Sequence, residues 1–148
     1  MKVREIMTRN PTCVLRIDTI QSAARKMLLE NVGSLPVVAD HNQHILVGII
    51  TDRDIAVRAI AEGKGLDTTV DQVMSRDSLV TAHPEDDAND LIKAMADHQV
   101  RRIPILDENN SVVGIVAQAD VARRIDQDKT TGVVVENISK PGGEHTQS

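Results

Sequence analysis

One short segment of the sequence combines residue types that can hold a phosphorylated sugar. Residues 48–54 read Gly-Ile-Ile-Thr-Asp-Arg-Asp, which predicts a buried strand that runs into the first turn of a helix. The N–H groups at a helix N-terminus attract anions, and the hydroxyl of Thr51 can hold a phosphate oxygen there. The carboxylate of Asp54 can accept hydrogen bonds from the vicinal hydroxyls of a ribose. The segment indicates either a nucleotide contact or a Thr-x-x-Asp capping box that only satisfies the helix end.

Two adjacent arginines form a second candidate group. Arg101 and Arg102 directly precede the apolar run Ile103-Pro104-Ile105-Leu106. A guanidinium group presents a fork of donors that suits phosphate oxygens, so the pair is a candidate for binding the charged end of a nucleotide. The alternative is that both arginines form surface ion pairs with the abundant acidic residues.

These candidate residues belong to a sequence that is repeated. The same residue types recur in the same order between residues 3–61 and 70–125, and five pairs mark the correspondence: Met7 with Met74, Met27 with Met95, Pro36 with Pro104, Gly48 with Gly114, and Asp54 with Asp120. Such a repeat predicts two copies of one supersecondary unit, packed with pseudo-twofold symmetry around a cleft. We expect the function to lie in that cleft.

Each copy is predicted to fold as strand, helix, strand, strand, helix, which makes the protein α/β, or α+β. In the first copy, residues 12–14 form the first strand, and Asp18 is expected to cap the next helix with Gln21 at the capping-box position. The apolar stripes of the two first helices have matching helical spacing: Ile20, Ala23, Ala24 and Met27, then Ala88, Leu91, Ile92 and Met95. The second helices are expected to start near Thr51 and Ala117. Pro36 and Pro104 are expected at a sheet edge or strand start, because proline donates nothing to a central ladder.

The predicted domain organisation follows the repeat. Residues 1–62 form the first repeat, 63–69 a linker and 70–127 the second repeat. Residues 128–148 form a C-terminal extension, and its distal part, from Pro141-Gly142-Gly143 onward, is expected to be disordered.

Composition disfavours several classes of protein. The 148-residue chain carries a net charge of −5 and has no Phe, Trp or Tyr, which argues against a nucleic-acid partner and its stacking platforms. No apolar run approaches the roughly 20 residues that span a bilayer, and the N-terminus lacks a signal-like apolar stretch, so we expect no membrane partner. The single cysteine, Cys13, suits a reducing cytoplasm.

The order of the motifs resembles a tandem cystathionine-β-synthase-type domain, the CBS pair or Bateman module. The first copy carries Val3-x-x-Ile6-Met7, Leu35-Pro36-Val37-Val38 and Gly48-Ile49-Ile50-Thr51-x-x-Asp54, and the second carries Val70-x-x-Val73-Met74, Ile103-Pro104-Ile105-Leu106 and Gly114-Ile115-Val116-Ala117-x-x-Asp120. The resemblance covers about residues 1–126 and is greatest to free-standing bacterial CBS-pair proteins.

The resemblance implies a regulatory module, without a catalytic cofactor, that binds an adenine nucleotide or related adenosyl ligand such as AMP, ADP, ATP, S-adenosylmethionine or NAD. By position, Thr51 would contact phosphate and Asp54 the ribose. The residues that would wall in the base are Thr12, Val14, Ser34, Leu35 and Pro36. These roles follow from the family and not from the spacing of the residues.

The second repeat departs from the family pattern, which implies two unequal sites. Ala117 replaces the hydroxyl residue, whereas Asp120 can still bind a ribose, so a weaker phosphate contact is expected there. The neighbouring candidates Ile103 and Pro104 follow the two arginines, and either Arg101 or Arg102 would complete the Thr51/Asp54 site.

Family resemblance also implies a cytoplasmic homodimer whose packing responds to the ligand and is read by a protein target. Two rival hypotheses remain: a ligand-free structural or interaction protein, and a small nucleotide-processing enzyme. The sequence nominates no nucleophile for such an enzyme. His41-x-x-His44 is the only His pair with ligand-like spacing, and without further ligands we expect no metal site.

Overall fold

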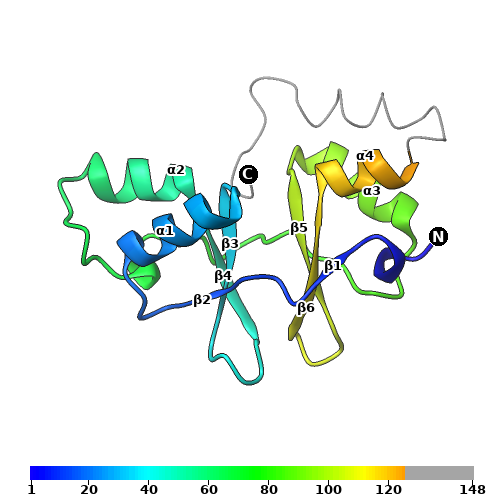
Figure 1. Cartoon of the computed structure of the whole chain (residues 1–148), viewed down its shortest axis with the longest axis horizontal. Coiled ribbons are helices and arrows are strands. Elements are labelled where there is room, and N and C mark those ends of the chain that lie inside the picture. The colour runs from blue at the N-terminus through cyan, green and yellow to red at the C-terminus, as the bar shows by residue number, and fades with distance from the viewer. Residues whose placement is uncertain (126–148) are drawn as a thin grey trace. The chain divides into compact units, whose positions relative to one another are not determined.

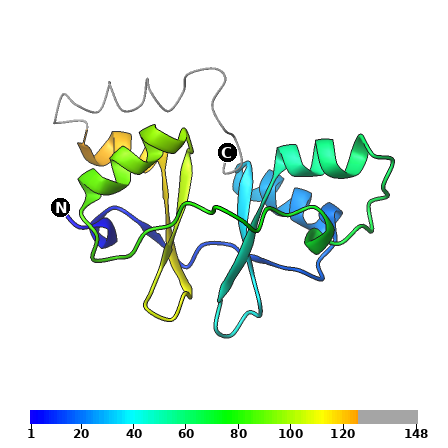
Figure 2. The same cartoon turned by 180° about the vertical axis from the view of Figure 1, so that it is seen from behind.

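The computed structural model describes residues 1–125, and the predicted C-terminal extension lies outside them. Within this range the chain divides into two compact units. The first-repeat unit comprises residues 12–79, and the second-repeat unit comprises residues 1–11 together with 80–125. Each unit is a small sheet with helices on one of its faces (Figures 1 and 2).

The first-repeat unit contains a three-stranded sheet in the order β2-β3-β4, in which β2 is parallel and β4 antiparallel to β3. Its elements in chain order are β2 (Val14–Leu15), α1 (Ile20–Glu30), β3 (Ser34–Val38), β4 (Leu46–Thr51), α2 (Asp52–Asp54), the π-helical continuation η2 (Ile55–Ile60) and the 3₁₀ turn η3 (Val70–Gln72).

The second-repeat unit has the sheet order β1-β6-β5, with both pairings antiparallel. Its elements are the 3₁₀ turn η1 (Val3–Glu5), β1 (Thr8–Arg9), α3 (Ala88–His98), β5 (Arg102–Leu106), β6 (Val112–Ala117) and α4 (Gln118–Ile125). The predicted mixed α/β class is therefore confirmed, with four α-helices and two three-stranded sheets among the described residues.

Each unit takes one segment from the other repeat in the sequence. In the second-repeat unit, Thr8 and Arg9 pair with Ile115 and Gly114 of β6. In the first-repeat unit, the N–H and C=O of Ser75 exchange hydrogen bonds of 2.8 and 2.9 Å with Ile49 of β4. Among the described residues, the second-repeat unit is therefore made of two separate stretches of sequence, whereas the first-repeat unit is one stretch that extends into the second repeat.

Two glycines make this exchange possible. A Cβ on Gly48 would lie 2.7 Å from the carbonyl oxygen of Ser75, and one on Gly114 would lie 2.6 Å from the sulfur of Met7. At Gly48 the short contact is with backbone, so only glycine lets the exchanged segment approach the strand, whereas at Gly114 the side chain of Met7 would have to shift. The recurring methionines therefore pack against the glycine of the opposite repeat: Met7 on Gly114, and Met74 on Gly48.

The predicted helix stripes largely form the two cores. Ala88, Leu91, Ile92 and Met95 of α3 are all buried, as predicted. On α1, Ile20, Ala23 and Met27 are buried, but Ala24 is exposed.

Three local predictions were wrong. The first strand is Val14–Leu15, so Thr12 and Cys13 precede it. The N-cap of α1 is Thr19, whose hydroxyl accepts a 3.1 Å hydrogen bond from the N–H of Ser22, while Gln21 takes no part in the cap. Asp18 instead closes the preceding turn by accepting from the N–H of Leu15 at 2.9 Å. In the second repeat Asp87 caps α3, and it aligns with Thr19. Alignment of the two copies could therefore have identified Thr19 as the N-cap.

Pro36 contradicts the expectation of an edge position, because it lies inside the central strand β3. Its partner across the sheet is Ile49, whose N–H and C=O both form hydrogen bonds with Ser75. The Pro36–Ile49 pair would therefore lack hydrogen bonds whichever residue stood at position 36. On its other side, β2 reaches only Val37 and Val38. The missing N–H of Pro36 therefore leaves no partner unsatisfied. Pro104 does lie in the edge strand β5, although not at its start.

Candidate functional site

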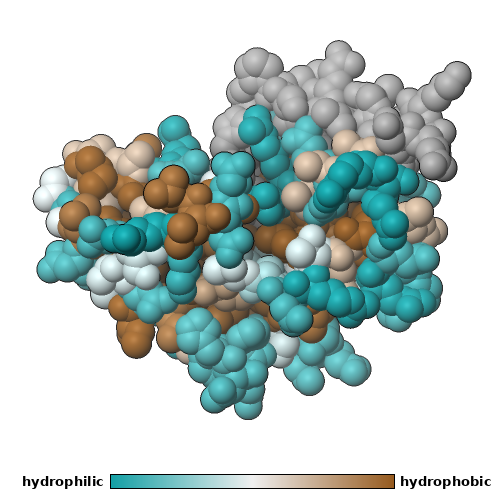
Figure 3. All heavy atoms as spheres, viewed as in Figure 1, coloured by the Kyte–Doolittle hydropathy of each residue, from teal (hydrophilic) through white to brown (hydrophobic). Residues whose placement is uncertain are grey.

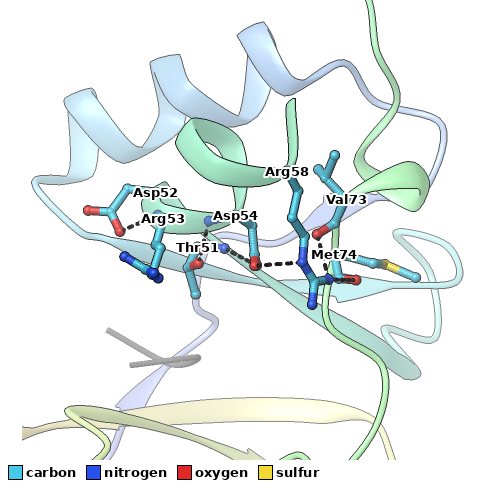
Figure 4. Close-up of polar contacts among 7 residues, drawn as sticks. All are labelled: Thr51, Asp52, Arg53, Asp54, Arg58, Val73 and Met74. Atoms are coloured by element: carbon cyan, nitrogen blue, oxygen red, sulfur yellow. Dashed lines mark hydrogen bonds and ion pairs between the residues drawn. The ribbon is translucent and has the colours of Figure 1, made fainter. Parts of the chain in front are cut away.

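Thr51 and Asp54 form a reciprocal, buried pair at the junction of β4 and α2 (Figure 4). The N–H of Thr51 donates to Oδ2 of Asp54, and the N–H of Asp54 donates to the hydroxyl of Thr51, both at 3.0 Å. The capping box is thus present. It does not use up the chemistry of either side chain, because the hydroxyl keeps its own proton and the carboxylate keeps acceptor positions.

The carboxylate of Asp54 is in an unfavourable place for a charge. Burial raises its pKa, which the hydrogen bonds from Thr51 and the charge of Arg58 oppose, while Asp52 raises it further. The cation that pairs with it is Arg58, whose Nε lies 3.8 Å from Oδ1 of Asp54. A helix cap does not require a buried carboxylate, so this burial needs another explanation.

Asp120 occupies the matching place in the second-repeat unit, between β6 and α4. Its Oδ2 accepts from the N–H of Ala117 at 3.1 Å, but Ala117 has no hydroxyl to complete the reciprocal bond. Oδ1 of Asp120 accepts from Nη2 of Arg123. The two aspartates are almost equally buried, at 7% exposed for Asp54 and 8% for Asp120.

The strands β3 and β5 place the predicted neighbours of these aspartates in the same register. Ser34 lies opposite Thr51, as Arg102 lies opposite Ala117. Burial lowers the pKa of the half-buried Arg102, and the charge of Asp120 opposes that shift. The structure therefore gathers Ser34, Thr51 and Asp54 in one unit, and in the other it brings Arg102 near Asp120.

The remaining predicted residues differ in accessibility. Leu35, Pro36, Ile103 and Pro104 are buried in their strands, and Val14 is fully buried in the core of its unit. The hydroxyl of Thr12 donates to Oε1 of Glu30 at 2.8 Å. Arg101 is exposed, and its carbonyl accepts a 2.8 Å hydrogen bond from the N–H of Gln118.

Sequence reasoning missed two equivalent arginines. Arg58 donates to the carbonyls of Val73 and Met74 at 3.2 Å each, and Arg124 donates to the carbonyl of Glu5. Each arginine follows its site aspartate by four residues and holds the segment that comes from the other repeat. Both could have been found from the sequence by aligning the two copies on Asp54 and Asp120, because an arginine then stands at the same position in each.

The second-repeat unit also has a pocket beside its aspartate, with a volume of about 400 Å³. Its lining residues come from the N-terminal segment and from α4: Glu5, Ile6, Met7, Thr8, Asp120, Arg123 and Arg124. The sequence predicted Asp120 as part of a site but did not identify Arg123 or Arg124.

The weaker candidates stay apart from this chemistry. Burial raises the pKa of the Cys13 thiol to about 11, so it is protonated at neutral pH. The rings of His41 and His44 lie 6.2 Å apart, and among residues 1–125 no group of three or more metal-ligating side chains is assembled. In the same range, no helix is both long and apolar enough to cross a membrane.

Comparisons with known proteins agree with the repeat. The CBS domain family matches residues 3–60 and 70–127. The CBS domain-containing protein YhcV of Bacillus subtilis is 43% identical over 137 residues, which are 93% of this chain and 94% of YhcV.

Two solved structures are also similar. Hypoxic Response Protein I, which in Mycobacterium tuberculosis is named Hypoxic response protein 1, was solved with two coordinated zinc ions. It matches with a TM-score of 0.73 and 33% identity over 83% of this chain and 98% of the other. The CBS domain pair of protein MJ0100, solved in complex with 5′-methylthioadenosine and S-adenosyl-L-methionine, matches with a TM-score of 0.73 and 30% identity over 86% and 97% of the two chains.

Proposed function

Since this chain belongs to the family of CBS-domain proteins, with two CBS domains in tandem, we propose that it is a regulatory module that binds an adenosyl ligand. The observation that carries the proposal is the pair of buried carboxylates, Asp54 and Asp120, at equivalent strand–helix junctions. Each keeps an oxygen, Oδ1, that no backbone N–H uses in its cap. A carboxylate held in this way suits the two hydroxyls of a ribose, which are both donors.

The proposed roles in the first-repeat unit are those that the family resemblance implies. Asp54 binds the ribose, the proton of the Thr51 hydroxyl is donated to a phosphate oxygen, and Ser34 and Leu35 lie beside the base. The adenosyl compounds bound to the related MJ0100 pair support an adenosyl ligand, and AMP, ADP, ATP, S-adenosylmethionine and NAD are the candidates.

We propose that the ligand is a signal and not a substrate. In this account binding changes how copies of the chain pack, and a protein target reads the change. Exposed apolar side chains on α1 and η2 support a homodimer: Leu28, Leu29 and Ile60 are 80%, 82% and 53% exposed. Figure 3 shows apolar residues at the surface over the helices of the first-repeat unit. A cytoplasmic location fits a chain whose single cysteine, Cys13, can form no disulfide within the chain. Release of product from any bound nucleotide would instead support the enzyme hypothesis.

Thermal unfolding with each candidate ligand tests the proposal. A ligand at a hundred times its dissociation constant stabilises the folded state by about 2.7 kcal/mol, which is readily seen as a rise in Tm. We expect at least one of the five compounds to raise Tm and expect Asp54→Asn together with Asp120→Asn to abolish the rise. If none of them changes Tm at millimolar concentration, the chain is an interaction protein without an adenosyl ligand.

A further inference from the structure

We propose that Arg123 makes the pocket beside Asp120 selective for adenosyl ligands that carry a phosphate over those that do not. The inference rests on the proposed function, because it names the ligand class that one of the two carboxylate sites prefers. It is carried by the pocket, by the contacts of Arg123 and by the difference between the two repeats.

The pocket has the volume of a small-molecule site. Its volume of about 400 Å³ lies within the range of roughly 300–1,000 Å³ that ligand pockets occupy. Met7 and Ile6 give it an apolar side, while Thr8, Asp120 and Arg123 give it polar groups. Such a mixture can hold a nucleoside with its sugar on the carboxylate.

Arg123 is placed to serve both the carboxylate and an anion. Its Nη2 donates to Oδ1 of Asp120, and the guanidinium lines the same pocket. A guanidinium has five N–H donors, so most of them stay available to the oxygens of a phosphate group beside the ribose. The side chain is 76% exposed, so it can adjust to a ligand without disturbing the core.

The charges around Asp120 also favour an anion. Arg123 pairs with the carboxylate directly, Arg102 interacts with it electrostatically, and Arg124 lines the pocket. The opposing charges that line the pocket are Asp120 itself and Glu5, whose Oε2 accepts from the N–H of Lys2 at 2.6 Å. Among the lining residues two arginines balance two carboxylates, and Arg102, which is not part of the lining, adds a third positive charge near Asp120 that favours an anion.

The first repeat lacks this arrangement. Val57, which is 44% exposed, stands where the second repeat has Arg123. The cation that pairs with Asp54 is Arg58, and its guanidinium is held by the carbonyls of Val73 and Met74. In the second repeat, Arg123 therefore takes the phosphate-binding role that we assign to the hydroxyl of Thr51 in the first.

Isothermal titration with AMP and with adenosine tests this assignment, because the two probes differ only by the phosphate. For the natural protein we expect tighter binding of AMP than of adenosine. We expect Arg123→Val to weaken the binding of AMP by about tenfold, which is the size of one charge-assisted contact. The affinity for adenosine should change by no more than about twofold. Arg123→Lys should keep part of the preference for AMP over adenosine, and Val57→Arg should increase that preference.

Two controls separate the possible failures. Lys93→Val removes a positive charge from an exposed position on α3, outside the pocket lining, and should leave the AMP-to-adenosine ratio unchanged. Asp120→Asn should remove the phosphate-selective binding, whereas Asp54→Asn should keep it. Circular dichroism confirms that each variant is folded.

Three outcomes would overturn the assignment. Equal weakening of both probes in Arg123→Val would mean that Arg123 only orients Asp120. Unchanged affinities for both probes in that variant would mean that the Asp120–Arg123 contact is a surface ion pair without a role in binding. Failure of the natural protein to bind either probe, while S-adenosylmethionine or NAD still raises Tm, would overturn the phosphate preference but leave the proposed function standing.

Discussion

At the scale of single residues, the site depends on carboxylates that are buried at a cost. Asp54 and Asp120 lose most of their hydration. Asp54 has in its place the hydrogen bonds from Thr51 and the charge of Arg58, and Asp120 has one backbone N–H and Arg123. For Asp54 the balance is unfavourable, since burial raises its pKa above the ordinary 3.8. Ribose hydroxyls would supply the missing donors, which is the residue-level reason to expect a ligand.

The raised pKa of Asp54 predicts a pH dependence of stability. Because the folded state binds the proton more tightly than the unfolded state, this group destabilises the fold at neutral pH, and stability recovers as pH falls through the raised pKa. Asp54→Asn cannot titrate and so lacks this contribution. We expect the free energy of unfolding of the natural protein, minus that of Asp54→Asn, to increase from pH 7 towards pH values near 4 in urea titrations. A difference that decreases on acidification would contradict the assigned direction.

At the scale of elements, strand–helix junctions place the two sites, and the two junctions differ in one hydroxyl. Periodicity predicted the helices, and the repeated motif predicted that Thr51 and Ala117 lie just before helix starts. The sequence could not show that the first segment of each repeat packs with the other unit, because such pairing joins residues far apart in the chain. Nor did it predict Pro36 in a central strand, which depends on where the neighbouring strand ends. Arg58 and Arg124 are marked only when the two copies are aligned on their aspartates, and Arg123 is not marked even then because Val57 takes the matching position.

The unequal caps predict opposite effects of two matched substitutions. Thr51→Ala removes the hydroxyl that accepts from the N–H of Asp54, which should lower the free energy of unfolding by about 1 kcal/mol. Ala117→Ser supplies the missing hydroxyl in the other unit and should raise it by roughly 0.5–1 kcal/mol. Urea unfolding of the two variants checks both signs. Destabilisation by Ala117→Ser would show that the second junction does not share the geometry of the first.

The exchanged segments predict a sharp intolerance at one glycine. Gly48→Ala places a methyl group 2.7 Å from the carbonyl oxygen of Ser75 and should destabilise the protein by roughly 1–3 kcal/mol. Gly65→Ala is the control, since its methyl group would meet only the side-chain oxygen of Asp67, at 3.0 Å, which can move away. Thermal unfolding should therefore show a clear fall in Tm for the first variant and little change for the second. Equal Tm values for the two variants would contradict the packing role of Gly48.

At the scale of the whole molecule, the two repeats present different surfaces. Leu28 and Leu29 are exposed on α1, whereas Ala96 and Asp97 take the matching positions on α3. Exposed leucines on one helix favour contact with another apolar surface, and in a twofold dimer the same patch of a second copy can provide it. The chain thus combines a similar fold in its two halves with different side chains at the two proposed ligand sites and on the two helix surfaces.

The apolar surface of α1 predicts where the proposed homodimer forms. Leu29→Asp puts a charge into that surface and should shift the protein from dimer to monomer in sedimentation experiments. Lys93→Asp introduces the same residue on α3, at a side chain that is 78% exposed, and should leave the dimer intact. Dissociation by Lys93→Asp, or a dimer that survives Leu29→Asp, would place the contact elsewhere.

The most direct test of the central claim is the identification of small molecules that accompany the protein through purification. The natural chain and the double variant Asp54→Asn, Asp120→Asn are purified without added nucleotide, denatured, and their small-molecule extracts compared by mass spectrometry. We predict an adenosyl compound in the extract of the natural protein and its absence from that of the double variant. An adenosyl compound retained in equal amount by both proteins would contradict the claim that the two buried aspartates hold its ribose.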